Sequence, residues 1–392
     1  MTAEVRGRAT ASTHRARTSV FVVFATNGMV LSTWISRIPA IKEDLALSPG
    51  RLGLVLLAMS TGSVLALPTS GAVVGRFGAA RTVRLSALVS CLGLALTGSA
   101  GGVALLVIGL FLMGLGSANW DVAMNVEGAE VERRLARAIM PRFHASFSAG
   151  TVLGALLGAG AIAAGLSTPA HLAVVAVAVL ALTLVACRDF LPAVVHPEGE
   201  PAPAGRGALA AWHEPRTVMI GLLVLAFAFA EGSANDWLAT AVNEGYGVSH
   251  ATGVLVFAVF VTAMTAGRLA GTPALDRFGR VPVLRCTAVL AVVGLLLVVL
   301  GGSVQVAAVG AVLWGLGASL GFPVGMSAGA DDPAHAAARV SVVASIGYTA
   351  FLAGPPLIGF LGDRVGVLAS LWVVLVVLAT SLVTAGATRE PR

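Results

Sequence analysis

The two halves of this chain repeat one another in register across apolar segments. The segment GLFLMGLGSANWDVAMN at 109–125 aligns with GAVLWGLGASLGFPVGM at 310–326, and the tripeptide RFG at 76–78 recurs at 277–279. Both matches are offset by 201 residues, so one unit of about half the chain occurs twice. When such a unit is a set of membrane-spanning helices, two copies that face each other leave a cleft at the membrane midplane. The repeat therefore predicts a pair of homologous helical bundles.

The apolar content of the chain excludes a soluble globular protein. Hydrophobic residues make up 57% of the sequence and charged residues 11%, whereas about 25% charge is usual in soluble domains. Runs of about 20 apolar residues recur, and each is long enough to cross roughly 30 Å of hydrocarbon. We expect an all-α membrane protein with twelve transmembrane helices in two pseudo-symmetric six-helix bundles. The expected spans are 19–38, 51–74, 82–100, 103–126, 142–164, 168–187, 217–241, 251–274, 282–301, 305–328, 339–361 and 367–387.

The joint between the halves is rich in proline and charge. Pro192, Pro197, Pro201 and Pro203 occur in it, and a segment of this kind is typical of a flexible linker. The expected organisation is a tail (1–18), a first bundle (19–187), a linker (188–215), a second bundle (216–387) and a short tail (388–392).

Basic residues alternate between the expected loops. The net charge is +6, and the arginines concentrate in the loops on the side of the N-terminus. By the positive-inside rule, both termini are then cytoplasmic. The charges lie along one membrane face, so we expect no nucleic-acid partner. The first 18 residues carry no cleavage-site pattern, which favours a tail over a removed signal peptide. The expected location is the bacterial cytoplasmic membrane, with a multi-pass topology.

Two loops carry the same short motif. After the second span the chain reads GAVVGRFGAARTVR (71–84), and after the eighth it reads LDRFGRVPVLR (275–285). Both resemble the signature loop of the major facilitator superfamily, G-x-x-x-D-R-x-G-R-R, which in that family latches the outward-facing state. The first copy has Gly75 where the family has its Asp. The alternative is an ordinary positive-inside turn. The resemblance implies gating roles for Arg76, Gly78, Asp276, Arg277, Gly279 and Arg280.

Longer strings extend the resemblance over nearly the whole chain. MNVEGAEVER (124–133), FAEGSANDW (229–237), LWGLGASLGFP (313–323) and ARVSVVASIGYTAFLAGPPLIG (338–359) are similar to the YbjJ-type bacterial inner-membrane group of this superfamily. That group is similar, more weakly, to the fucose:proton symporter family. The resemblance implies transport by alternating access, and it does not reveal a substrate.

Three acids fall inside expected spans, namely Asp121, Glu231 and Asp236. Ionisable residues at membrane depth are costly, at about 2.5–3.5 kcal/mol on insertion scales, and they usually mark a functional site. Asp236 lies nearest the outside, where it is a candidate for an external gate.

Asp121 is the candidate for proton coupling. Asn125 lies four residues on, hence on the same helix face, while His144 and Ser148 open the next helix at a similar depth. A carboxylate near an imidazole in a partly dry cavity can exchange protons near neutral pH. The resemblance to proton:sugar symporters also places a proton-binding acid on this helix. The alternative is a structural hydrogen bond to the backbone or to Arg142.

The substrate candidates lie on the first and seventh helices. Glu231 and Asn235 share a face, and Asn27 lies near the matching place in the other repeat. Trp34 and Trp237 also correspond, and they either stack on a sugar face or anchor the membrane interface. With Asn125 and Ser148, these residues form the expected polar lining.

Two further features bear on these helices. Arg268, inside the eighth span, is expected to extend to the cytoplasmic surface. Pro323 and the pair Pro355–Pro356 predict kinks in the tenth and eleventh helices.

Together these observations predict a secondary active transporter for a small, polar, sugar-like solute, coupled to protons by symport. A proton-driven exporter of drugs or metabolites remains an alternative, and a non-transporting membrane sensor is a weaker one. We expect a monomer in the lipid bilayer whose partners are the solute and protons. We expect no enzyme activity, no cofactor and no metal, because the sequence shows neither a nucleotide-binding glycine loop with lysine nor a metal-ligand pattern.

Overall fold

The computed structural model describes residues 3–135, 139–191, 211–329, 331 and 336–389. Within these ranges, 12 helices are long and apolar enough to cross a membrane. The candidate spans are Ser12–Asp44, Pro49–Ala66, Ala79–Gly98, Val103–Glu132, Arg142–Ala163, Thr168–Ala186, Pro215–Tyr246, His250–Gly271, Arg280–Leu300, Val304–Gly329, Val342–Val365 and Val367–Thr388. The expected all-α fold with twelve spans is confirmed.

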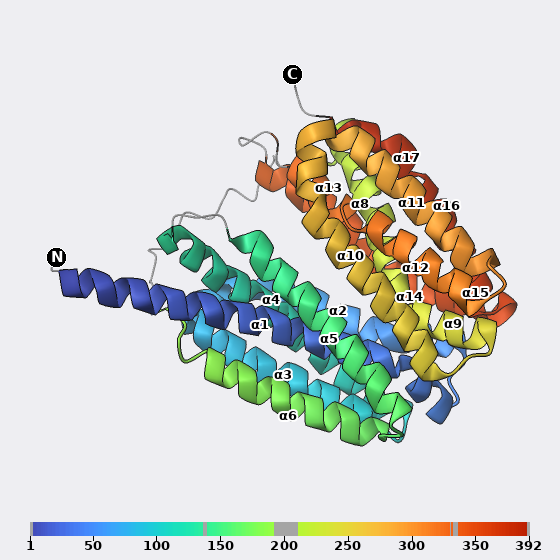
Figure 1. The fold of residues 1–392 in the computed structure, drawn as a ribbon, viewed down its shortest axis with the longest axis horizontal. Coiled ribbons are helices and arrows are strands. Elements are labelled where there is room, and N and C mark those ends of the chain that lie inside the picture. The colour runs from blue at the N-terminus through green and yellow to red at the C-terminus, as the bar shows by residue number, and fades with distance from the viewer. Residues whose placement is uncertain (1–2, 136–138, 192–210, 330, 332–335, 390–392) are drawn as a thin grey trace. The chain divides into compact units, whose positions relative to one another are not determined.

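The chain divides into two compact units. Residues 1–46 and 55–196 form the first, and residues 47–54 with 197–392 form the second. The helices of the first unit are α1 (Ala3–Asp44), α2 (Pro49–Phe77), α3 (Ala79–Gly98), α4 (Val103–Leu135), α5 (Met140–Ala163) and α6 (Thr168–Ala186). In this unit α1 packs along α5, and α3 packs along α4 and α6 (Figure 1).

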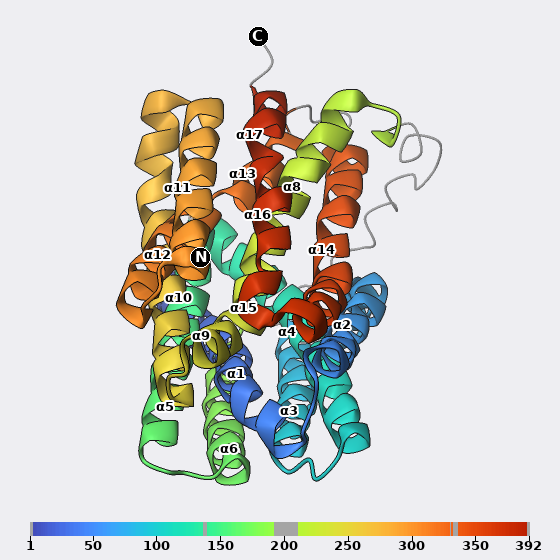
Figure 2. The ribbon, with the colours of Figure 1, turned by 90° about the vertical axis from the view of Figure 1, so that its right-hand side faces the viewer.

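The second unit contains more helical segments than spans, because several of its spans are interrupted. Its segments are α8 (Pro215–Ser233), the π-helix η1 (Ala234–Leu238), α9 (Ala239–Tyr246), α10 (His250–Phe278), α11 (Arg280–Leu300), α12 (Val304–Ala318), α13 (Gly321–Gly329), α14 (Ala336–Val365), α15 (Val367–Ser370), α16 (Trp372–Ala379), α17 (Ser381–Thr384) and the 3₁₀-helix η2 (Ala385–Thr388). Figure 2 shows α11 along α12 and α14 along α8, and both pairs are in contact.

Glycine contacts between helices repeat with the spacing of the sequence repeat. A Cβ on Gly93 of α3 would lie 2.5 Å from the carbonyl oxygen of Gly109 in α4, and a Cβ on Gly294 of α11 would lie 2.5 Å from that of Gly310 in α12. The helix backbones therefore meet at equivalent crossings in the two units. Small residues permit such close approach in membrane helices, so the duplication extends to the packing.

A second row of glycines joins α5 to α1. A Cβ on Gly150 would meet the carbonyl oxygen of Ala25, and one on Gly154 would lie 2.9 Å from that of Met29. Gly158 lies against Ser36 in the same way. These three residues form one small-residue face on α5, because they are spaced by four.

The first turn of α2 packs within the second unit. The backbone N–H of Gly50 donates to Asp363 Oδ1 of α14 over 2.9 Å, and Ser48 Oγ is 3.3 Å from Asp363 Oδ2. A Cβ on Gly53 would meet the carbonyl oxygen of Pro355. Contacts to α14 therefore group residues 47–54 with the second unit.

The expectations for the linker, the N-terminal tail and the proline kinks have different outcomes. Residues 192–210 of the expected linker lie outside the described part of the chain. The expected N-terminal tail continues into α1, which begins at Ala3. The kink expected at Pro323 is a break between α12 and α13, whereas α14 runs through Pro355 and Pro356 as one helix.

Candidate functional site

An ion pair joins α8 to α10 in the second unit. Arg268 Nη2 donates to both carboxylate oxygens of Glu231 at 3.0 Å each. The side chains remain partly exposed, 32% for Arg268 and 19% for Glu231. The expectation that Arg268 extends to the cytoplasmic surface is therefore wrong. A carboxylate one helix away satisfies the guanidinium at membrane depth, which is less costly than leaving either charge unpaired.

The break between α12 and α13 supplies a hydrogen-bond acceptor for Nε of the same guanidinium. Arg268 Nε lies 3.4 Å from the carbonyl oxygen of Ser319, between α12 and α13. In a continuous helix this oxygen would accept from the N–H of residue 323, but Pro323 has no N–H. A Cβ on Gly267 would lie 2.5 Å from Ser319 Oγ, so glycine allows α10 to approach the break. The proline thus leaves an acceptor that Arg268 uses.

A π-helical segment follows Glu231. It spans Ala234–Leu238 and separates α8 from α9 within one candidate span. Such segments add a residue to the helical turn, and they are frequent at functional sites. Asn235 and Asp236 lie in it and are both partly exposed. The added residue changes the direction in which these polar side chains leave the helix, relative to a regular α-helix.

The two tryptophans proposed for stacking are enclosed by protein. Trp34 in α1 is 1% exposed and Trp237 in the π-segment is 0% exposed. In this conformation neither ring offers a face to a solute or to a membrane interface. Both act as packing residues here, and a stacking role would require them to become uncovered.

Asp121 lies on α4 in the first unit with its side chain exposed. Asn125 Nδ2 donates to the backbone oxygen of Asp121 over 2.8 Å and to its Oδ1 over 3.3 Å. The face of α4 that packs on α3, at Gly109 and Gly116, lies about a third of a turn away. The structure thus brings Asp121 and Asn125 together, away from the α3 contact.

His144 and Ser148, which were expected near Asp121, lie on α5, and Asn27, a candidate for the substrate lining, lies on α1. The ring of His144 lies 5.2 Å from that of Phe24 in an edge-to-face arrangement. Ser148 is buried, with its Oγ 3.3 Å from the carbonyl oxygen of His144. Asn27 is buried as well, and its Nδ2 lies 3.8 Å from the sulfur of Met124 on α4.

The loop motifs have the same backbone in both units. Gly78 and Gly279 each have φ of 77°, with ψ of 157° and 168°. This region of torsion space is essentially restricted to glycine. Each is preceded by an arginine over a phenylalanine ring, with Arg76 5.9 Å from the Phe77 centroid and Arg277 5.2 Å from the Phe278 centroid.

The charged contacts of the second motif run through Arg280. Its Nη1 donates to Asp331 Oδ1 over 2.7 Å, and Arg216 Nη2 donates to Asp331 Oδ2 over 2.7 Å. Asp276, the acid of the family motif, is exposed, and we find no hydrogen bond or ion pair to it in the described ranges. Asp331 therefore takes the role of charge partner in this conformation.

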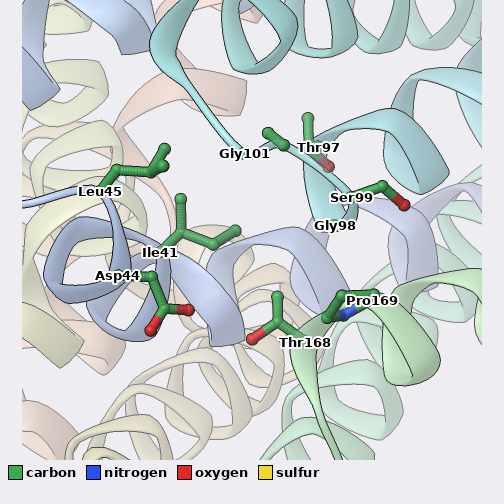
Figure 3. A pocket seen from close by; sticks show the side chains of 10 residues that line it. Ile41, Asp44, Leu45, Thr97, Gly98, Ser99, Gly101, Thr168 and Pro169 are labelled. Atoms are coloured by element: carbon green, nitrogen blue, oxygen red, sulfur yellow. The ribbon is translucent and has the colours of Figure 1, made fainter.

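Two pockets among the described residues lie at the ends of helices, and none of these candidate residues lines them. One of about 250 Å³ in the first unit is lined by residues at the ends of α1 and α3 and the start of α6, including Asp44, Thr97 and Thr168 (Figure 3). None of the proposed substrate or proton residues lines it. Among the described residues, no group of three or more His, Cys, Asp or Glu side chains could hold a metal ion.

The sequence also matches a known family of membrane transporters. The model described as "Major Facilitator Superfamily" matches residues 19–273 and, in a second match, 220–392. The chain belongs to the Major Facilitator Superfamily. The two matches together cover residues 19–392.

Related proteins align with this chain over most of their length. An uncharacterized transporter, y4wD, of Sinorhizobium fredii is 32% identical over 359 residues, 87% of this chain and 89% of the relative. An uncharacterized MFS-type transporter of Yersinia pestis is 32% identical over 376 residues, 94% of both chains. The membrane protein MosC of Rhizobium meliloti is 26% identical over 352 residues, 89% of this chain and 84% of MosC. The chain is a multi-pass membrane transporter.

Solved structures of other superfamily members share the fold. The nucleoside transporter NupG has a TM-score of 0.75 at 14% identity, covering 95% of this chain and 98% of NupG. The fucose:proton symporter FucP of E. coli, as a variant with one residue replaced, has a TM-score of 0.64 at 16% identity, covering 95% of this chain and 98% of FucP. At these identities the likeness concerns the fold.

The sequence analysis did not predict two ion-pair partners, namely Glu231 for Arg268 and Asp331 for Arg280. Arg268 and Glu231 are opposite charges in consecutive spans, and that balance was the available signal. Asp331 follows the tenth span by two residues, in a set of loops that is rich in arginine.

Proposed function

We propose that the protein is a secondary active transporter that moves a small polar solute by alternating access, with protons as the coupling ion. The observation that carries the proposal is the exposed carboxylate of Asp121 within the span Val103–Glu132, bonded to Asn125. An acid at membrane depth is costly against lipid and is retained where it faces a bundle interior or water.

Protonation of Asp121 would remove its charge, and closing the site around it would then cost less. This is the physical basis of coupling. One proton that moves down about 100 mV releases about 2.3 kcal/mol. At about 1.4 kcal/mol per tenfold, this supports roughly fiftyfold accumulation of a neutral solute.

The orientation proposed from the arginine distribution puts both termini in the cytoplasm of a bacterium. The solute class is proposed from chemistry: the amide of Asn235 and the carboxylate of Glu231, both in the second unit, suit a hydroxylated compound. The nucleoside and fucose specificities of NupG and FucP define a starting set of solutes for testing.

The test uses purified protein in proteoliposomes that enclose a pH-sensitive dye. Pools of sugars, nucleosides and organic acids are added outside, and proton movement and solute uptake are followed together. We expect one pool to drive proton movement, and Asp121→Asn to abolish uphill uptake while solute exchange continues. Concentrative uptake by Asp121→Asn at the wild-type level would refute the role of Asp121.

Asp189→Asn is the matched control. Asp189 is an exposed acid outside the spans, 3.7 Å from Arg15 at the end of the first unit. This variant should retain both uptake and proton movement. His144→Gln tests the second titratable candidate, and we expect a reduced rate of coupled uptake, because glutamine cannot exchange a proton as an imidazole can.

A further inference from the structure

We propose that Arg268 recognises a carboxylate on the transported solute, and that Glu231 occupies the guanidinium until the solute displaces it. This inference rests on the proposed transport function and names its substrate class as a hydroxylated organic acid. Its basis is the geometry of one ion pair and of the helix break beside it.

The pair leaves part of the guanidinium unused. Both oxygens of Glu231 are bonded through a single nitrogen, Nη2. Arginine carries five N–H donors, and its strongest anion contacts use two nitrogens in a fork. Within the described ranges no hydrogen bond from Nη1 is found, and the Arg268 side chain is 32% exposed. A second anion can therefore approach the same guanidinium.

The guanidinium of Arg268 is held at its Nε by a second contact. Nε is directed to the Ser319 oxygen, and the residue four positions on, Pro323, has no N–H to donate to that oxygen. Gly267 keeps α10 close to this break. An arginine anchored at Nε presents its terminal nitrogens in one direction, so little side-chain freedom is lost when an anion binds.

Glu231 has the chemistry of an internal substitute ligand. Its carboxylate is the group that an organic acid would present, and at 19% exposure it can be exchanged without unpacking a core. Asn235, one turn along, and Asp236 supply acceptors and donors for hydroxyl groups of the same molecule.

For an acidic solute the driving force differs from the one calculated above for a neutral solute. A monovalent carboxylate that enters with one proton on Asp121 moves no net charge across the membrane. Uptake of such a solute would then respond to the pH gradient and not to the membrane potential, which a potassium gradient with valinomycin can set independently.

The experiment compares solutes that differ by one carboxylate, namely glucuronate with glucose and gluconate with sorbitol. Binding to the purified protein is measured by thermal shift, and uptake in proteoliposomes. We expect the acids to bind and the neutral partners to bind at least tenfold more weakly. Arg268→Gln should weaken acid binding about ten- to a hundredfold, as expected for a charged hydrogen bond.

Two further variants keep the test decisive. Arg268→Gln leaves Glu231 unpaired, so the double variant Glu231→Gln with Arg268→Gln removes both charges and should fold while still failing to bind the acids. Glu231→Gln alone should tighten acid binding, because the internal competitor is gone. Arg285→Gln, an exposed arginine bonded to the Leu382 carbonyl oxygen, is the control and should bind as the wild type does.

Equal binding of neutral and acidic partners, or unchanged acid binding in the double variant, would overturn the assignment of Arg268. Asp121-dependent uptake of a neutral solute would overturn it as well, while leaving the proposed transport function standing. If no solute of either class causes Asp121-dependent proton movement, the proposed function itself fails.

Discussion

Gly93 of α3 and Gly109 of α4 meet so closely that a Cβ on the first would lie 2.5 Å from the carbonyl oxygen of the second. The same relationship holds at Gly294 and Gly310. Because the neighbouring atoms are backbone, they cannot rotate away as a side-chain tip could. A substitution at either crossing must move a whole helix.

We therefore expect Gly93→Ala and Gly294→Ala to destabilise their units by about 1–3 kcal/mol, the usual range for overpacking. Thermal unfolding of the purified protein in detergent measures the effect. Gly160→Ala is the control, because a Cβ at this helical position would meet nothing within 4 Å. That variant should be unchanged or more stable by about 0.5–1 kcal/mol. Similar melting of all three variants would show that the crossings tolerate a methyl group.

The loop glycines give a second prediction. Gly78→Ala and Gly279→Ala should each cost about 1–3 kcal/mol, because alanine must adopt φ of 77° with an extended ψ. Gly75→Ala, three residues before Gly78, has open space at its Cβ and no positive φ, so it should not lower stability. Unfolding midpoints of the three variants settle the comparison. Equal stability of Gly78→Ala and Gly75→Ala would contradict it.

Asp331 gives a third prediction. Its carboxylate accepts from Arg216 and Arg280 and is 9% exposed, so Asp331→Asn leaves two arginines without their shared partner. We expect a loss of about 1–3 kcal/mol, reduced toward the lower end by the partial exposure of Arg216. Asp189→Asn breaks a more exposed, longer pair and should cost at most about 0.5 kcal/mol. The prediction fails if the two variants unfold at the same temperature.

Pro323 gives the fourth prediction. Pro323→Ala restores an N–H that can bond to the Ser319 carbonyl oxygen, so this oxygen no longer serves Arg268 alone. We expect the protein to fold with equal or higher stability, while uptake of its solute falls several-fold. Pro356→Ala, in the continuous helix α14, is the matched proline control and should retain uptake. Wild-type uptake by Pro323→Ala would show that the break is not needed to position Arg268.

The sequence predicted features that depend on length and periodicity. Twelve apolar runs and a constant offset were sufficient for the spans. These features follow from hydrophobic thickness and helix geometry, which act on each segment separately.

Contacts between side chains on different helices were harder to predict from the sequence. The partner of Arg268 depends on how α10 is rotated against α8, and a single sequence leaves that rotation undetermined. The π-segment at 234–238 contains no glycine or proline, so its sequence does not indicate the added residue. Burial of Trp34 and Trp237 likewise depends on neighbours from other helices.

The π-segment has a consequence for how the two copies correspond. The equivalent stretch of α1 is regular helix. The seventh span therefore needs one residue more than the first to cover the same distance along the helix axis. No gap-free alignment can then match the first and seventh spans on both sides of Trp237. The symmetry between the two copies is therefore lost at Asn235 and Asp236, the polar residues of the π-segment.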